Sequence, residues 1–142
     1  GIGPELPDEL FVLPVENLLL QQNSIRTVPA SLSDLAPTLR YLHFFQNVLE
    51  ADSFPASMRD LANLAFLEVS ANRIATDDGD LPDELYGIPN LQQLDAVCVG
   101  ITRVRGELWD SPLTLLQLKH NAVTELPAPT AEQAAAMPGL AD

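Results

Sequence analysis

One spaced pattern of apolar residues recurs along this chain and constrains its fold more than any other feature. In its clearest copy, residues 113–127 read L-x-x-L-x-L-x-x-N-x-V-x-x-L-P, where x is a variable residue. Copies begin near residues 15, 39, 64, 91 and 113, so each starts 22 to 27 residues after the one before. Five matches in one register predict a solenoid, in which every repeat packs on its neighbours and no central core has to close.

Each copy contains the signals for a short strand followed by a turn. The alternation x-L-x-L-x has a period of two residues, which predicts a strand with one buried face. Asparagine follows the strand in four of the copies, and its amide side chain can bond the backbone of adjacent turns. We therefore expect a ladder of asparagines along the solenoid. Its members are Asn23, Asn47, Asn72 and Asn121.

The segment after each asparagine position predicts a helical turn on the outer side of the solenoid. Apolar pairs at i and i+3, such as Leu32 with Leu35 and Met58 with Leu61, suit one turn of α- or 3₁₀-helix packed by one edge. Proline discourages a strand and favours the first position of such a turn. The recurrent prolines are Pro29, Pro55, Pro82 and Pro127.

The repeated pattern resembles that of the leucine-rich repeat family, and the resemblance covers nearly the whole chain. It implies an α/β fold, a section of a right-handed horseshoe. Short parallel strands would form the concave face, and short helical, 3₁₀ or irregular segments would form the convex face. The outer segments of the form L-P-x-x-L are more similar to those of intracellular members than to the L-x-G-x-I-P form of plant receptors.

The five complete repeats span residues 15–127, and both ends of the chain lie outside them. Residues 1–14 are interpreted as the end of a preceding repeat or an irregular N-terminal cap, because residues 6–10 repeat the pentapeptide at 81–85. Residues 128–142 are interpreted as an outer segment and the start of a sixth repeat at Leu140, or as a C-terminal cap. A capping box at Thr130 predicts a short helix there. Since no polar cap is recognisable, we expect a monomeric segment of a longer chain.

The charge and cysteine content narrow the classes of partner and compartment. A net charge of −13 at pH 7 disfavours nucleic acid and anionic membranes as partners. Two interpretations of the charge remain: it attracts a protein with a basic surface, or it only keeps a long convex face soluble. No apolar run is long enough to cross a bilayer, so membrane insertion is not expected. Cys98 is the single cysteine and cannot form an internal disulfide, which favours a reducing, cytoplasmic setting.

The predicted concave face carries one cluster of aromatic residues. Alternate residues of a strand face the same side, so positions three, five and seven of the repeats form three columns. Three aromatic rings fall on two adjacent strands, with a histidine among them and two carboxylates beside them. Such a cluster has the rigid anchors and polar rim of a binding hot spot, unless other side chains cover the rings. The candidate partner-binding residues are Tyr41, His43, Phe45, Phe66, Glu68 and Asp95.

Two departures from the pattern lie next to each other. Val99 stands at the asparagine position of the fourth repeat, so the loop at Gly100 must satisfy its backbone otherwise. Residues 75–80 are extra in the third repeat, and we expect them to bulge from the rim. Their aspartates suggest a calcium site, but the spacing does not fit an EF-hand loop, so we expect a solvated turn.

The sequence has no pattern typical of catalysis. The motifs of phosphate-binding loops, dinucleotide-binding folds and serine hydrolases are missing from it. His43 and His120 lie three predicted strands apart, about 15 Å, which is too far to share a metal. His43, His120 and Cys98 are expected to be surface or partly buried residues without chemistry. The alternative for Cys98, which follows the strand of the weakest repeat, is a buried small hydrophobe. We therefore expect no enzyme activity, no metal and no cofactor.

Three interpretations of function remain. The first is a protein–protein interaction module in signalling or scaffolding, which binds through the concave sheet. The second comes from the resemblance alone: a recognition segment of a larger signalling enzyme, such as a kinase, a GTPase-containing protein or a ubiquitin ligase. The third is a spacer whose concave face binds nothing, and the aromatic cluster counts against it. The first interpretation is favoured.

Overall fold

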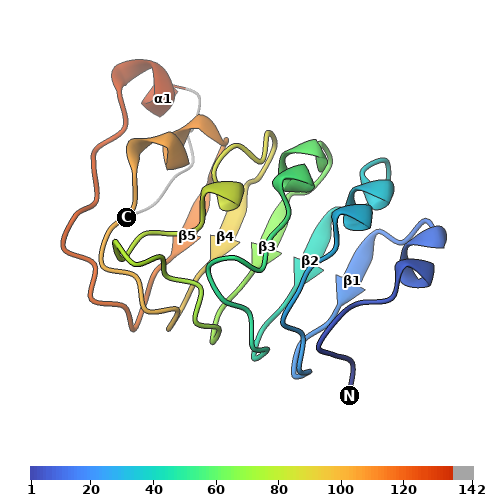
Figure 1. Ribbon diagram of the computed structural model, residues 1–142. Coiled ribbons are helices and arrows are strands. Elements are labelled where there is room, and N and C mark those ends of the chain that lie inside the picture. The colour runs from blue at the N-terminus through green and yellow to red at the C-terminus, as the bar shows by residue number, and fades with distance from the viewer. Residues whose placement is uncertain (136–142) are drawn as a thin grey trace.

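The protein forms one open sheet of five parallel strands, which lie side by side in the computed structural model (Figure 1). The structure describes residues 1–135. The strands pair in chain order, as expected when every repeat packs on the next. This is the solenoid that the sequence predicts. The strands are β1 (Asn17–Leu19), β2 (Tyr41–His43), β3 (Phe66–Glu68), β4 (Gln93–Asp95) and β5 (Leu115–Gln117).

The strand register aligns the same repeat position in every strand. At position three, Tyr41 pairs with Asn17 on one side and with Phe66 on the other. At position five, His43 pairs with Leu19 and Glu68 in the same way. The pairing of β3 with β4 and of β4 with β5 continues both columns, so they match the columns expected from the sequence. The middle residue of every strand is a leucine: Leu18, Leu42, Leu67, Leu94 and Leu116.

A short 3₁₀ turn accompanies each strand on the opposite side of the core (Figure 1). Four of the five turns follow a proline with an extended backbone, whose φ lies between −57° and −79°. Proline starts these turns because its ring fixes φ and it has no N–H to donate to a strand. The fifth turn follows Arg105 instead. The turns are η1 (Asp8–Val12), η2 (Ala30–Leu35), η3 (Ala56–Asp60), η4 (Asp83–Leu85) and η5 (Gly106–Asp110).

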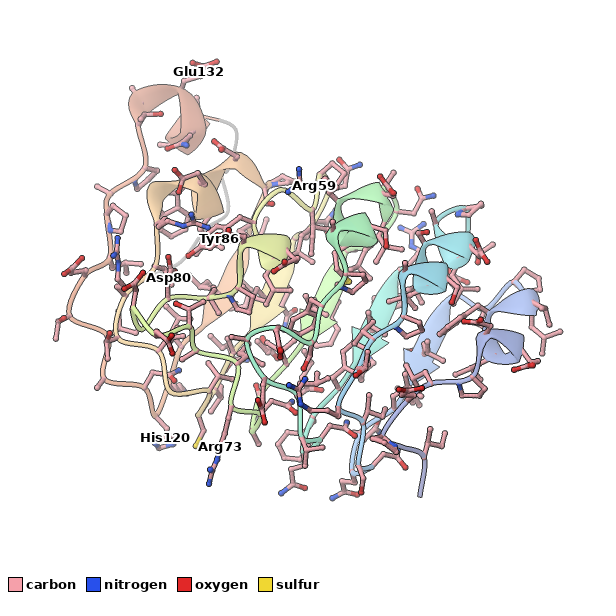
Figure 2. All side chains as sticks on the ribbon, in the orientation of Figure 1. Arg59, Arg73, Asp80, Tyr86, His120 and Glu132 are labelled. Atoms are coloured by element: carbon pink, nitrogen blue, oxygen red, sulfur yellow. The ribbon has the colours of Figure 1, made fainter. Side chains whose placement is uncertain are left out.

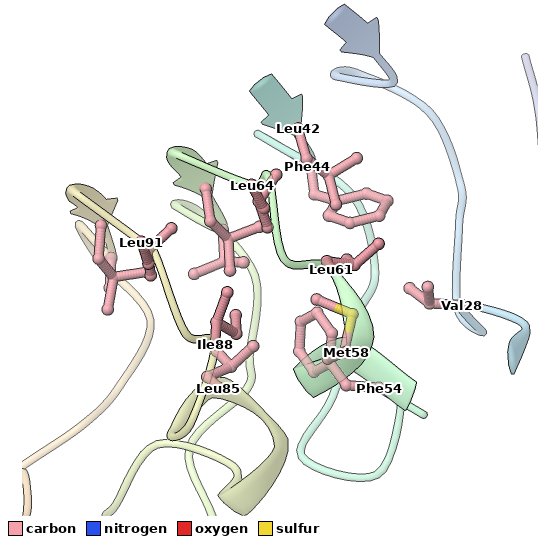
Figure 3. Packing of buried hydrophobic residues seen from close by; sticks show 14 of the residues in the cluster. Val28, Leu42, Phe44, Phe54, Met58, Leu61, Leu64, Leu85, Ile88 and Leu91 are labelled. Carbon is pink, nitrogen blue, oxygen red and sulfur yellow. The ribbon is translucent and has the colours of Figure 1, made fainter. Parts of the chain in front are cut away.

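The core is a layer of apolar side chains between the sheet and the 3₁₀ turns (Figure 3). Leu42 and Phe44 enter it from the second repeat's strand segment and are fully buried. Met58 and Leu61 meet them from the turn side, as the i, i+3 pattern predicted. The ring of Phe54 approaches that of Phe44 edge-on, with centroids 6.4 Å apart, a favourable aromatic geometry. Burial of this one layer holds each repeat against its neighbours.

Asparagine side chains join successive repeats where the strands end. Asn47 donates from Nδ2 to the carbonyl oxygens of Leu20 and Phe44, at 2.8 and 3.0 Å. Its Oδ1 accepts the backbone N–H of Ile25 at 3.0 Å. One side chain thus serves three backbone groups from two repeats. The other asparagines that accept a backbone N–H of the preceding repeat are Asn23, Asn72 and Asn121.

Val99 interrupts the asparagine ladder, and a side chain of the fifth repeat supplies the hydrogen bonds at this point. The Oδ1 atom of Asn121 accepts the backbone N–H groups of both Val99 and Gly100, each at 2.9 Å. Its Nδ2 donates to the carbonyl oxygen of Ala96 at 2.7 Å. Val99 itself is buried. The backbone N–H groups of the loop at Gly100 therefore do find a partner, the side chain of Asn121.

Residues 75–80 form a tight turn that is fastened to the fourth repeat. The backbone N–H of Thr76 donates to the carbonyl oxygen of Asp80, and that of Thr102 donates to the carbonyl oxygen of Gly79. Gly79 has φ +78°, and a Cβ atom there would come within 2.1 Å of the Thr102 hydroxyl oxygen, so only glycine fits. Asp80 is buried, with 7% of its surface exposed. The expectation of a fully solvated turn is wrong, because Asp80 turns inward.

The residue before each asparagine position has a left-handed backbone. Its φ lies between +53° and +59° in all five repeats. Such angles are uncommon for residues other than glycine, and here they turn the chain out of the strand. Cys98 occupies this turn in the fourth repeat and is exposed, so it is a surface residue and not the buried small hydrophobe that was the alternative. The five residues are Gln22, Gln46, Ala71, Cys98 and His120.

Both ends of the described chain pack on the repeats next to them. Glu5 forms a parallel bridge with Thr27, and η1 packs on η2. Helix α1 (Ala131–Ala135) begins with the expected capping box: Thr130 N–H donates to Gln133 Oε1, and Gln133 N–H donates to Thr130 Oγ1. The predicted repeat start at Leu140 lies outside the described residues. Within residues 1–135, no helix is long and apolar enough to cross a membrane.

Candidate functional site

A shallow groove of about 340 Å³ crosses the strand face that points away from the core. It extends from β2 across β3 to β4, over part of the aromatic cluster expected from the sequence. Two aromatic rings, an imidazole, two primary amides and a hydroxyl group line it. The lining residues are Tyr41, His43, Ala65, Phe66, Gln92, Gln93 and Thr114.

The ring side chains of the groove come from neighbouring strands in register. Tyr41 on β2 pairs with Phe66 on β3 and is 42% exposed. The imidazole of His43 lies against the ring of Phe66, with centroids 4.8 Å apart and planes inclined by 44°. Its Nδ1 atom lies 3.2 Å from Glu68 Oε2. These contacts hold His43 and Phe66 in place while the Tyr41 ring remains open to solvent.

Two carboxylates stand side by side at the edge of this groove. Glu68 and Asp95 are paired in the parallel register of β3 and β4. Like charges in directly opposed positions of a sheet destabilise it. Glu68 lies near His43, and Asp95 accepts a hydrogen bond of 3.1 Å from Gln93 Nε2. Within residues 1–135 no ion pair involves Asp95, so the edge of the groove is negatively charged.

The structure brings together five of the six residues expected to bind a partner. Tyr41, His43 and Phe66 line the groove, and Glu68 and Asp95 border it through the hydrogen bonds just described. Phe45 does not line it. It follows the end of β2 at position seven and is half-buried. Five of the six residues therefore lie in the groove or at its acidic edge, and the ring of Phe45 lies apart from it.

Position seven does not form an exposed column throughout. Ser70 stands at position seven of the third repeat, so the predicted column places it on the outward face, but only 4% of its surface is exposed. Its Oγ atom accepts the backbone N–H of Val97 at 3.0 Å. The strand has ended two residues earlier, so the small hydroxyl group can reach the backbone of the next repeat. That expectation for Ser70 is wrong.

A buried polar network on the side of the 3₁₀ turns was not expected from the sequence. Asp80 and Tyr86 lie next to each other there (Figure 2), and the Tyr86 hydroxyl donates to Asp80 Oδ1. The same carboxyl oxygen accepts the backbone N–H of Leu81 at 2.7 Å. Arg105 donates its backbone N–H to the Tyr86 hydroxyl at 3.0 Å, and its guanidinium lies 4.2 Å from the centroid of the Tyr86 ring. The network fastens the 75–80 turn to the fourth repeat.

The guanidinium of Arg105 balances the charge of this network. Its Nε atom lies 3.1 Å from Asp80 Oδ2, within ion-pair distance although not aligned for a hydrogen bond. Its Nη2 atom donates to Asp83 Oδ1 at 2.7 Å. The sequence held one faint signal, an aspartate at the end of an insertion. Nothing in the spacing connects it to an arginine 25 residues further on.

The network predicts a loss of stability at alkaline pH. Burial, and then the hydrogen bond to Asp80, raises the pKa of Tyr86 to about 12. In the unfolded chain the phenol ionises above pH 10, whereas in the folded protein it keeps its proton up to about pH 12. Loss of the proton therefore stabilises the unfolded state relative to the folded state as the pH rises from 10 to 12, and the free energy of unfolding falls. We expect the free energy of unfolding to fall by about 2 kcal/mol over this range relative to Tyr86→Phe. Urea unfolding of both proteins at several pH values measures the difference.

Tyr41→Phe is the matched control, since it removes one hydroxyl group from the exposed face. We expect the difference between wild type and Tyr86→Phe to shrink above pH 10, while that between wild type and Tyr41→Phe stays the same. Parallel pH curves for the wild type and Tyr86→Phe would contradict the role given to the buried phenol.

The described residues do not assemble a metal site. Among residues 1–135, no group of three or more histidine, cysteine, aspartate or glutamate side chains is arranged to hold a metal ion. Of the aspartates at 77–80, Asp80 is engaged with Tyr86 and Arg105 instead. The groove itself offers aromatic rings, an imidazole and amide groups, with two carboxylates at its edge.

Comparison with known proteins shows what the fold resembles. No protein-family model and no curated protein matches the sequence. The chain is similar to the crystal structure of PEPR1-AtPEP1, with 25% identity and a TM-score of 0.70 over 96% of this chain and 19% of that one. It is also similar to the plant peptide hormone receptor RGFR1 in complex with RGF2, with 23% identity and a TM-score of 0.71 over 96% of this chain and 22% of that one.

A bacterial structure has the same architecture. The LRR protein LIC12759 of Leptospira interrogans is 20% identical, with a TM-score of 0.64 over 96% of this chain and 38% of that one. The chain thus spans well under half the length of each of these three structures. At 23% and 20% identity the likeness shows the fold alone, which is a stack of parallel strands with outer turns.

Proposed function

We propose that this leucine-rich-repeat protein binds another protein through the exposed face of its sheet, in signalling or scaffolding. The observation that carries the proposal is the groove across β2, β3 and β4, which the exposed ring of Tyr41 helps to line. Its volume of about 340 Å³ is at the lower end of the range for small binding pockets, enough for one large side chain of a partner.

The sheet is a suitable support for such a site. Tyr41, His43 and Phe66 all stand on strands, whose positions are fixed by pairing on both sides. Sites on strands are more precise than sites on loops, because less motion has to be frozen when the partner binds. Aromatic rings bury much area at little cost in side-chain entropy, which makes them frequent anchors of interfaces.

The charge of the molecule supports a partner with a basic surface. The net charge is −13, and the carboxylates of Glu68 and Asp95 stand at the groove itself. Opposite charge would speed the encounter and exclude acidic proteins. The proposal is binding without catalysis, in a reducing cellular compartment, which the single cysteine supports.

A capture experiment with matched variants tests the proposal. The wild-type protein is immobilised and exposed to a lysate of the cells that produce it, beside the double variant Tyr41→Ala, Phe66→Ala. We expect a specific protein to be retained by the wild type and at least tenfold less of it by the double variant, since two anchors lost from the centre of an interface cost well over 1.4 kcal/mol.

The control is a second double variant on the same face, Leu19→Ala with Leu115→Ala. Both leucines are exposed, on β1 and β5, and neither lines the groove. We expect this variant to capture the partner as well as the wild type does, after circular dichroism has shown all three proteins to be folded. Equal loss in both variants, or equal capture by all three, would contradict a role for the groove.

A further inference from the structure

We infer that the groove accepts the guanidinium group of an arginine, presented by an extended segment of the partner. This inference rests on the proposed function and adds the chemistry of the recognised residue. It draws on three properties of the described residues: an unfavourable pair of like charges, aromatic rings that line the groove, and amide groups along it.

The pair of carboxylates is the first property. Glu68 and Asp95 occupy opposed positions on neighbouring strands, an arrangement that costs stability unless a cation lies between them. Their described contacts are with His43 and with the neutral amide of Gln93. Arg40, the cation that precedes β2 directly, pairs instead with Glu16, 3.8 Å away. Because the pair costs stability in the free protein, we interpret its position beside a groove as a binding site for a cation of another molecule.

The rings are the second property, and they select among cations. Tyr41 and Phe66 stand beside each other at the groove, with no lysine or arginine among its lining residues. A guanidinium group is planar, weakly hydrated and always charged, so it stacks on aromatic rings while its N–H groups bond carboxylates in pairs. An ammonium group carries a tighter hydration shell and has no plane to stack. The combination of rings and two carboxylates therefore favours arginine.

The amides are the third property, and they indicate how the partner chain lies. Gln92 and Gln93 line the groove at β4, and Thr114 lies beyond them towards β5. Primary amides both donate and accept hydrogen bonds, which suits the N–H and C=O groups of an extended backbone. Three neighbouring strands are about 10 Å across, the length of three extended residues. The arginine would enter near Phe66 while its flanking backbone lies across the strands.

The charge argument has a test that involves no ligand. Asp95→Asn keeps the oxygen that accepts the Gln93 amide and removes the repulsion from Glu68. We expect its thermal midpoint to exceed that of the wild type at low ionic strength and to approach it at high ionic strength, because salt screens exposed charges. A midpoint unchanged or lowered at low ionic strength would overturn the premise of an uncompensated pair.

The recognition itself is tested with blocked pentapeptides that carry a central arginine or a central citrulline between alanines. Citrulline has nearly the same shape without the charge. Nuclear magnetic resonance titration of the isotopically labelled protein follows the backbone amides of Ala65, Phe66 and Gln93. We expect saturable shifts with the arginine peptide in the millimolar range, and binding of the citrulline peptide at least about tenfold weaker.

The variant Glu68→Gln, Asp95→Asn separates charge from shape. We expect it to bind the arginine peptide about tenfold more weakly than the wild type does, and the citrulline peptide equally. Equal binding of the two peptides to the wild type, or no saturable shift with either, would overturn the inference. Such a result would leave the capture experiment with Tyr41→Ala, Phe66→Ala standing, so the failure of this inference is distinguishable from failure of the proposed function.

Discussion

Replacement of Asn47 by alanine is expected to lower the free energy of unfolding by about 3 kcal/mol. The change removes the hydrogen bonds to the carbonyl oxygens of Leu20 and Phe44 and from the N–H of Ile25. Asn47 is buried, so water cannot replace all three bonds. Each buried backbone group left without a partner costs about 1–3 kcal/mol, and partial entry of water reduces the sum. Urea unfolding, with extrapolation to zero denaturant, measures the loss.

Asn63→Ala is the matched control. The amide of Asn63 also bonds two backbone carbonyls of the preceding repeat, those of Ala36 and Pro37, but on an exposed surface where water can take its place. We expect a loss of less than about 1 kcal/mol there. Ser70 is unsuitable as a control, because it is buried and bonds Val97. Equal losses at Asn47 and Asn63 would mean that the ladder contributes no more than ordinary surface hydrogen bonds.

Replacement of Arg105 by methionine is expected to cost about 3 kcal/mol of stability. Methionine keeps most of the packing of the side chain, while the guanidinium beside the buried Asp80 carboxylate is lost. Removing one partner of a buried ion pair typically costs about 3–5 kcal/mol, and the lower end applies because a third of the Arg105 side chain is exposed. The cation–π contact with Tyr86 is lost as well. Thermal and urea unfolding both report the change.

Two further variants identify the cause. In an Asp80→Asn background, Arg105→Met should cost much less, because a neutral amide needs no counter-charge; the double-mutant cycle gives the coupling directly. Arg40→Met, which breaks an exposed ion pair with Glu16, should cost less than about 1 kcal/mol. Full loss of stability in the Asp80→Asn background would show that Arg105 acts through packing or through Asp83 rather than by neutralising Asp80.

These two networks support the candidate site from different sides of the molecule. Asn47 and Asn72 link the second and third repeats to their neighbours where β2 and β3 end. The Asp80 network fastens the turn between the third and fourth repeats, which carry β3 and β4. Because the groove spans β2, β3 and β4, both networks help to keep its walls in register.

The sequence by itself determined the solenoid and the strand columns. The pattern L-x-x-L-x-L-x-x-N contains both periods of the repeat, two residues within a strand and about 25 residues between strands. Pairing in register follows because a slip of one residue would turn leucines such as Leu42 and Leu67 outward. The prolines similarly fixed where the turns begin. For the same reason Tyr41 and Phe66 could be assigned to adjacent positions on one face.

Only the tertiary structure decided which polar side chains turn inward. Ser70 and Asp80 differ from expectation, and the sequence left Cys98 open between the surface and the core. Each of the three lies just outside a regular element. In such segments the direction of a side chain depends on the backbone φ of one turn and on the partners that another repeat offers. Cys98 faces solvent because its φ is +56°, and Asp80 is buried because Tyr86 and Arg105 reach it. A periodic pattern specifies neither, since both depend on the local backbone and on hydrogen bonds and ion pairs between residues of different repeats.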